Sequence, residues 1–79
     1  MKTMTCRQLG GACDEAFQAN TFDEMAELSK QHGIAMLKQQ DAAHLQAMGE
    51  MQSLMKDPAA MQAWFEQRKA EFEALPEDA

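Results

Sequence analysis

The residues with the most chemical potential in this sequence are two cysteines and two histidines. Cys6 and Cys13 stand on either side of a glycine pair near the N-terminus, and His32 and His44 follow. Thiolate sulfur and imidazole nitrogen are ligands that Zn²⁺ prefers in small structural sites. Two cysteines of a β-hairpin and a histidine of the next helix form the layout of such a site. Cys6, Cys13 and His32 are therefore candidate zinc ligands.

The spacing of these residues leaves other interpretations open. Residues 7–12 separate the two cysteines, a longer gap than the about two to four residues of common zinc motifs. No fourth ligand is obvious: His44 lies at the start of the second predicted helix, and Asp14 and Glu15 lie next to Cys13. The alternative, which residue statistics favour, is that the cysteines are small buried apolar side chains and that His32 is a hydrogen-bonded core histidine.

Copper and redox chemistry fit the residue types less well. Met4-Thr5-Cys6 is similar to the start of the metal-binding loop of copper chaperones, but Leu9 stands where their second cysteine belongs. A Cys6–Cys13 redox pair would require the two cysteines to lie opposite each other on adjacent strands. The sequence has no Cys-x-x-Cys motif that would make such thiols strongly reactive.

Enzymatic activity has little support in the sequence. A Cys13–His32 dyad would need a substrate cleft, and a chain of 79 residues offers little room for one. Phosphate-binding glycine loops are absent as well, because Gly10-Gly11 is followed by neither a Gly-Lys-Ser/Thr nor a dinucleotide motif. We expect a protein that is not an enzyme.

A β-hairpin is expected to position the cysteines. Side chains alternate over residues 2–7, and Gly10-Gly11 readily supplies the conformations of a turn. A second strand is predicted from about residue 13 to residue 19. Met4 and Phe17 then mark the side that faces the core, and both thiols point to that side.

The first helix is expected to carry His32. Thr21 with Glu24 three residues later forms a capping box, which places the start of the helix. His32 lies on the apolar stripe that faces the hairpin. Gly33 costs about 1 kcal/mol relative to Ala inside a helix, so the helix either ends there early or makes a close contact.

Two further helices complete the prediction. The first of them begins near Asp41, which is a good N-cap. The second begins at Asp57 and the proline that follows it, and it ends at Pro76. The result is an α+β, mostly helical fold. We expect a single domain over residues 1–79, with a ββα unit at 1–40 and an α-helical hairpin at 41–79.

Composition and charge exclude several functions. The net charge is −6 and the pI about 4.7, and the seven Lys and Arg are scattered. This argues against binding to nucleic acid or to anionic membranes, which require a cationic surface. No apolar run approaches the length of a membrane span, and the N-terminus lacks the apolar core of a signal peptide. We therefore expect a cytoplasmic protein whose cysteines are thiols or metal ligands.

Methionine is abundant, with eight residues in the chain. Several lie on the apolar stripes of the predicted helices, and Met48, Met51 and Met55 share one stripe. Such faces usually fill a core, but adaptable Met-rich faces also bind partner helices. Contact with a protein partner, or homodimerisation through the Met-rich helices, is therefore the expected mode of action.

The N-terminal half resembles the domain of unknown function 1059 family of short bacterial and archaeal proteins. The likeness covers residues 1–36 and rests on Cys6, Gly10, Cys13 and Asp14, followed by Thr21, Glu24 and His32. It implies a ββα zinc-finger variant with Cys6, Cys13 and His32 as ligands. Many members have a second histidine four or five residues after the first, where this chain has Met36 and Leu37. His44 would have to replace it. The family has no established activity, so the resemblance implies a fold more than a function.

Overall fold

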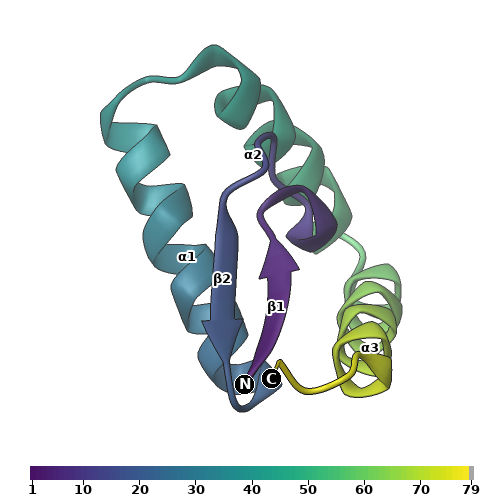
Figure 1. Ribbon diagram of the computed structural model, residues 1–79. Helices are drawn as coiled ribbons and strands as arrows, with labels where there is room; N and C mark the ends of the chain where they lie inside the picture. Colours follow the sequence, from purple (N-terminus) through teal and green to yellow (C-terminus); the bar gives the residue numbers. More distant parts are fainter. Residues whose placement is uncertain (79) are drawn as a thin grey trace.

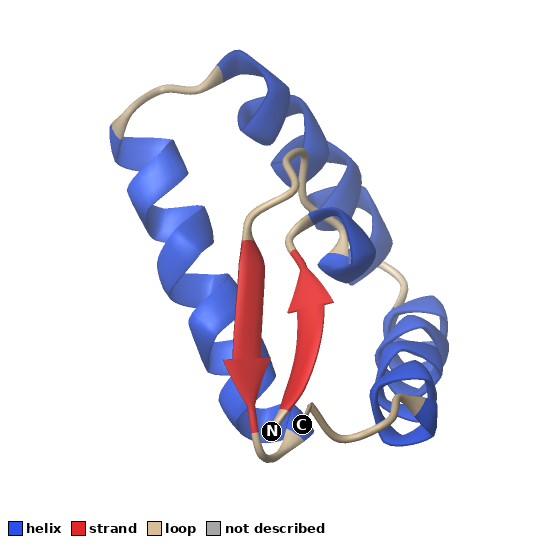
Figure 2. Cartoon of the chain, viewed as in Figure 1, coloured by secondary structure: helices blue, strands red, loops and turns tan. Residues whose placement is uncertain are grey.

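The computed structural model describes residues 1–78 (Figure 1). The chain begins with strand β1 (Lys2–Thr5), a short 3-10 helix (Arg7–Leu9) and strand β2 (Ala16–Ala19). Three helices follow: α1 (Phe22–Lys38), α2 (Ala42–Met55) and α3 (Pro58–Ala74). Helices thus dominate a fold that has one two-stranded sheet (Figure 2). The predicted α+β, mostly helical class is confirmed.

The hairpin is antiparallel, and its register places Met4 opposite Phe17. Met4 is 1% exposed and Phe17 packs against the buried core, as the alternation predicted. The strands carry the core residues on one face because side chains alternate along a strand. This face packs against α1, which lies along β2 (Figure 1).

The core combines residues from both halves of the sequence. Its buried members are Met4, Leu9, Ala19, Phe22, Met25 and Phe72. Phe22 stacks obliquely on Phe72, with ring centroids 5.9 Å apart, so that α1 and α3 share one apolar cluster. Burial of so few apolar side chains gives a chain of this size little stability to spare.

Each helix begins at the predicted cap. Thr21 Oγ1 accepts a hydrogen bond from the Glu24 N–H at 3.2 Å, and the carboxylates of Asp41 and Asp57 accept from the third residue of their helices at 3.0 and 3.2 Å. These bonds satisfy backbone donors that the first turn of a helix leaves unpaired. Gly33 does not break α1, which continues to Lys38.

The second strand is shorter than predicted, and the cysteines lie in the connection between the strands rather than on their faces. The Gly10-Gly11 turn is part of a longer loop in which the 3-10 helix follows Cys6. The Cys6 carbonyl accepts hydrogen bonds from the N–H groups of Leu9, at 3.0 Å, and Gly11, at 2.8 Å. The loop therefore winds around Cys6 instead of continuing the ladder.

The two ends of the described chain lie side by side (Figure 1). The Met1 ammonium is 2.7 Å from a Glu77 carboxylate oxygen, and the Asp78 N–H donates to the Met1 carbonyl at 2.6 Å. The ammonium lowers the pKa of Glu77 by hydrogen bonding and by its charge. Residues after α3 thereby close over the start of β1.

Among residues 1–78, every helix is too short or too polar to cross a membrane.

Candidate metal centre

Four side chains from three parts of the chain converge beside the hairpin loop. Cys6 and Cys13 come from that loop, His32 from α1 and His44 from the first turn of α2. One ligand atom from each residue lies within 4.8 Å of all the others. The structure thus brings together the three candidate ligands and the histidine that the sequence offered as the fourth.

Two of the separations within this cluster match those around a tetrahedral ion. Cys6 Sγ is 3.6 Å from His44 Nε2, and Cys13 Sγ is 3.3 Å from His32 Nε2. With the usual Zn–S and Zn–N bond lengths, neighbouring ligands of a tetrahedral Zn²⁺ are about 3.3–3.8 Å apart. The two sulfur–nitrogen pairs therefore have the spacing of tetrahedron edges. Without an ion, the same distances correspond to thiol–imidazole hydrogen bonds.

His44 is oriented by Asp41, the N-cap of α2. The Asp41 carboxylate accepts hydrogen bonds from the His44 N–H and from His44 Nδ1, the latter at 2.5 Å. A carboxylate only accepts, so Nδ1 carries the proton and Nε2 presents its lone pair to Cys6. Ligand histidines of metal sites commonly have this carboxylate partner.

Asp41 was predicted as a cap but not as a partner of His44. The signal was present in the spacing, because the third residue of a helix lies beside the capping side chain. The hydrogen bonds from His44, first from its side chain and then from its backbone, lower the pKa of Asp41. The carboxylate is therefore ionised at neutral pH and can stabilise positive charge on the His44 side.

The hairpin loop places Cys6 in a buried position. The side chain is 4% exposed, whereas Cys13 is half-buried. Burial raises the pKa of the Cys6 thiol because the charged thiolate loses its water shell. Backbone N–H groups of Cys13 and Ala12 act in the opposite direction. A cation bound to the sulfur would favour the thiolate outright.

His32, which is half-buried, contacts two aromatic rings. His32 makes edge contacts with Phe17, at 5.5 Å between ring centroids, and with His44, at 5.3 Å. Because α1 continues through Gly33, the His32 ring reaches the loop that carries Cys13.

A cavity of about 190 Å³ adjoins the cluster. Cys6, His32 and His44 line one side of it, and Met48 and Met51 of α2 line another. Three of the four cluster residues therefore border a common space, and the fourth, Cys13, contacts His32 beside it.

Gly11 is required at its position by the approach of Cys6. A Cβ atom on Gly11 would lie 2.1 Å from Cys6 Sγ and 3.0 Å from the Cys6 carbonyl oxygen. We expect Gly11→Ala to destabilise the protein by about 1–3 kcal/mol and to displace the cysteine, because the contact is with backbone as well as side chain. Urea unfolding and zinc titration would measure the two effects.

Gly49→Ala is the matched control for this variant. Gly49 lies within α2, and a Cβ atom there meets nothing within 4 Å. Ala favours a helix over Gly by about 1 kcal/mol, so this variant should be as stable as the parent or more stable. If Gly11→Ala and Gly49→Ala had equal stability in urea and bound zinc equally well, the loop would tolerate a side chain beside Cys6.

The fold and the cluster together define a small α+β protein with a Cys2His2 cluster that could hold a metal ion. Comparison of the sequence with protein-family models, with curated proteins and with solved structures gives no match.

Proposed function

We propose that the chain is a small, non-enzymatic, zinc-binding protein of the cytoplasm that acts through contacts with other proteins. In this proposal Cys6, Cys13, His32 and His44 hold one Zn²⁺ with a structural role. The observation that carries it is the pair of sulfur–nitrogen separations, 3.6 and 3.3 Å, within a cluster of four ligand atoms.

The ligand set favours zinc and a structural role. Two thiolates and two imidazoles are a common donor set of structural zinc sites, and a complete tetrahedron leaves no open position for a substrate. The resemblance of residues 1–36 to the domain of unknown function 1059 family would imply three of these ligands, Cys6, Cys13 and His32, and His44 would have to take the fourth position. A reducing compartment would keep both cysteines available for the ion, which supports the cytoplasmic location.

Elemental analysis of protein purified without chelator tests this proposal. We expect one zinc per chain in the parent protein and a much lower content in Cys13→Ser, because serine is a poor ligand for Zn²⁺. Ser53→Ala, which changes an exposed residue of α2 far along the helix from His44, is the control and should retain the metal.

Metal-free parent protein with unreactive thiols would contradict the proposal and leave the cluster as part of the core. Metal-free protein that rapidly and reversibly forms a Cys6–Cys13 disulfide would contradict it in favour of thiol redox work. Both sulfur atoms belong to the same cluster, so the redox alternative is tested by the same preparation.

A further inference from the structure

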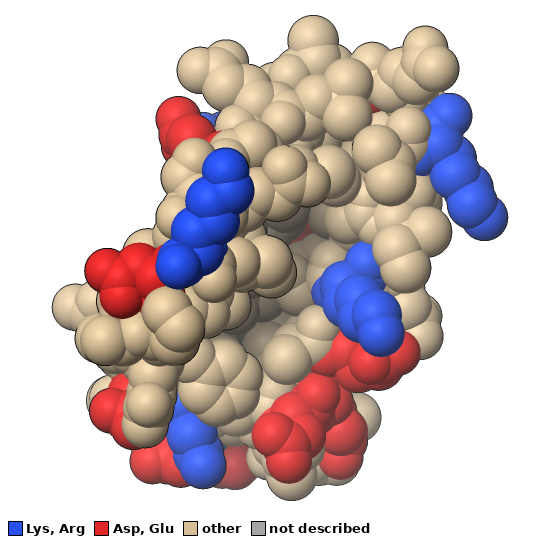
Figure 3. Space-filling model, turned by 180° about the vertical axis from the view of Figure 1, so that it is seen from behind, with Lys and Arg blue, Asp and Glu red and all other residues tan. Residues whose placement is uncertain are grey.

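A groove opens on the face of the molecule away from the hairpin. Two adjoining cavities of about 680 and 360 Å³ form it between α1, α2 and α3, and Met55, Met61 and Phe65 line both. The space-filling view from behind shows a hollow on this face with Lys or Arg side chains on both sides of it (Figure 3). We call this feature the rear groove.

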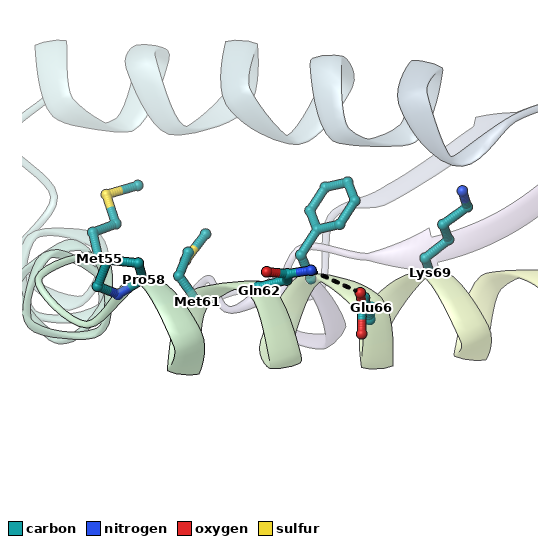
Figure 4. Close-up of a pocket in the computed structure, with 7 residues that line it drawn as sticks. Met55, Pro58, Met61, Gln62, Glu66 and Lys69 are labelled. Atoms are coloured by element: carbon teal, nitrogen blue, oxygen red, sulfur yellow. Dashed lines mark hydrogen bonds between the residues drawn. The ribbon is translucent and has the colours of Figure 1, made fainter.

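The rear groove is apolar and accessible. Met55 is 57% exposed and Phe65 is 38% exposed, although both are large apolar side chains. Met55 and Met61 extend from α2 and α3 toward the space below α1 (Figure 4). Trp64, the single tryptophan of the chain, lines the smaller of the two cavities. Burial of such surface by a partner is favourable, at roughly 25 cal/mol per Å² of apolar area.

The walls of the rear groove carry positive charge. Lys30 lines it from α1 and Lys69 from α3. Within residues 1–78, neither ammonium belongs to an ion pair. Glu66 is the one carboxylate among the described lining residues, and it accepts a hydrogen bond from Gln62 at 3.2 Å. The residues that line the groove thus carry two ammonium groups and one carboxylate on a chain of net charge −6. Lys69 also lines a neighbouring cavity together with the carboxylates of Asp23, Glu73 and Glu77, so Lys30 is the ammonium farther from other negative charge among these lining residues.

We propose that the rear groove binds an amphipathic α-helix of a partner protein, with apolar side chains on one face and Asp or Glu along its edges. Helices α1 and α3 each span 17 residues, about 25 Å, so a helix of about 16 residues would match their length. Its apolar face would contact Met55, Met61 and Phe65, in the way that amphipathic helices fill hydrophobic grooves. Carboxylates at its edges would face Lys30 and Lys69.

This inference rests on the protein-contact part of the proposed function and is independent of the metal. The experiment therefore uses full-length protein whose zinc content has been measured first. Two synthetic peptides of about 16 residues share a face of Leu and Ala, and carry either Glu or Lys at all edge positions. Binding is followed by the fluorescence of Trp64 and by the anisotropy of a labelled peptide.

We expect the Glu peptide to bind and the Lys peptide to bind at least about tenfold more weakly, since two edge contacts change sign. Lys30→Glu/Lys69→Glu should reverse this preference, and added salt should reduce it. Lys38→Glu, which reverses one charge at the end of α1 outside the groove, should leave the preference unchanged, whereas Lys30→Glu alone, with the same change of net charge, should reduce it. Met55→Glu, which places a carboxylate in the apolar contact, should weaken the Glu peptide.

Three results would overturn the inference: no binding of either peptide, tighter binding of the Lys peptide to the parent, or a preference that Lys30→Glu/Lys69→Glu does not alter. A concentration-dependent dimer that Met55→Glu disrupts would also overturn it, because a second copy would then occupy the groove. Zinc at one per chain without peptide binding would leave the metal proposal intact.

Discussion

Removal of zinc from the loaded protein by a chelator is expected to unfold most of the chain. The four proposed ligands come from the hairpin loop, α1 and α2, so one ion would join three elements. Structural zinc contributes apparent free energies of about 10–16 kcal/mol in small domains, more than the about 5 kcal/mol that a fold of this size commonly retains. The buried apolar core is too small to compensate for that loss.

Far-ultraviolet circular dichroism and Trp64 fluorescence, recorded during heating with and without chelator, would measure this effect. We expect a cooperative transition in the loaded protein, and a shallow or much lower transition after chelation that returns when zinc is restored. Cys13→Ser without chelator should behave as the chelated parent does. An unchanged transition after complete metal removal would show that Met4, Met25 and their neighbours hold the fold without the ion.

The elements that local sequence determines were predicted correctly. Thr21, Asp41 and Asp57 each cap a helix, because a capping side chain bonds the backbone only three residues away. The alternation that placed Met4 and Phe17 toward the core also depends on neighbours along one strand. Such patterns need no knowledge of the remaining fold.

The loop with the cysteines was harder to predict. Gly10-Gly11 favoured a tight turn between two longer strands, but the chain forms a 3-10 helix and Gly10 takes a left-handed conformation, with φ of 91°. Hydrogen bonds to the Cys6 carbonyl and the close approach of Gly11 to Cys6 decide this shape. The strand pattern at residues 13–15 carries no information about those contacts.

The position of His44 depends on the packing of α2 against α1. The sequence offered His44 as a possible fourth ligand, and the family resemblance implied a histidine near Met36 instead. The chain reverses direction between Lys38 and Asp41, with Gln40 at a positive φ of 55°, and the first turn of α2 then returns to the hairpin loop. A long-range arrangement of this kind cannot be inferred from the helical pattern of either segment.

Asp41→Ala is expected to lower both the stability of the protein and its affinity for zinc, whereas loss of a helix cap alone would lower only the stability. The variant removes the acceptor for the His44 N–H and the partner of His44 Nδ1. Loss of a cap costs about 1 kcal/mol, and loss of a carboxylate partner of a ligand histidine lowers metal affinity by about 10–100-fold. We therefore expect both lower stability and markedly weaker zinc binding in competition with a chromophoric chelator.

Asp57→Ala separates the two roles of Asp41. Asp57 caps α3 through the Ala60 N–H at 3.2 Å, in the same way that Asp41 caps α2, but no ligand of the cluster follows it. This variant should lose the stability of one cap, about 1 kcal/mol, and keep the zinc affinity of the parent. Compared with Asp41→Ala, Asp41→Ser should recover much of the lost stability but not the lost zinc affinity. The serine hydroxyl can accept the hydrogen bond from the backbone N–H of His44 but carries no charge. If Asp41→Ala and Asp57→Ala bound zinc equally well, Asp41 would be a cap alone, and the orientation of His44 would depend on its burial in the core.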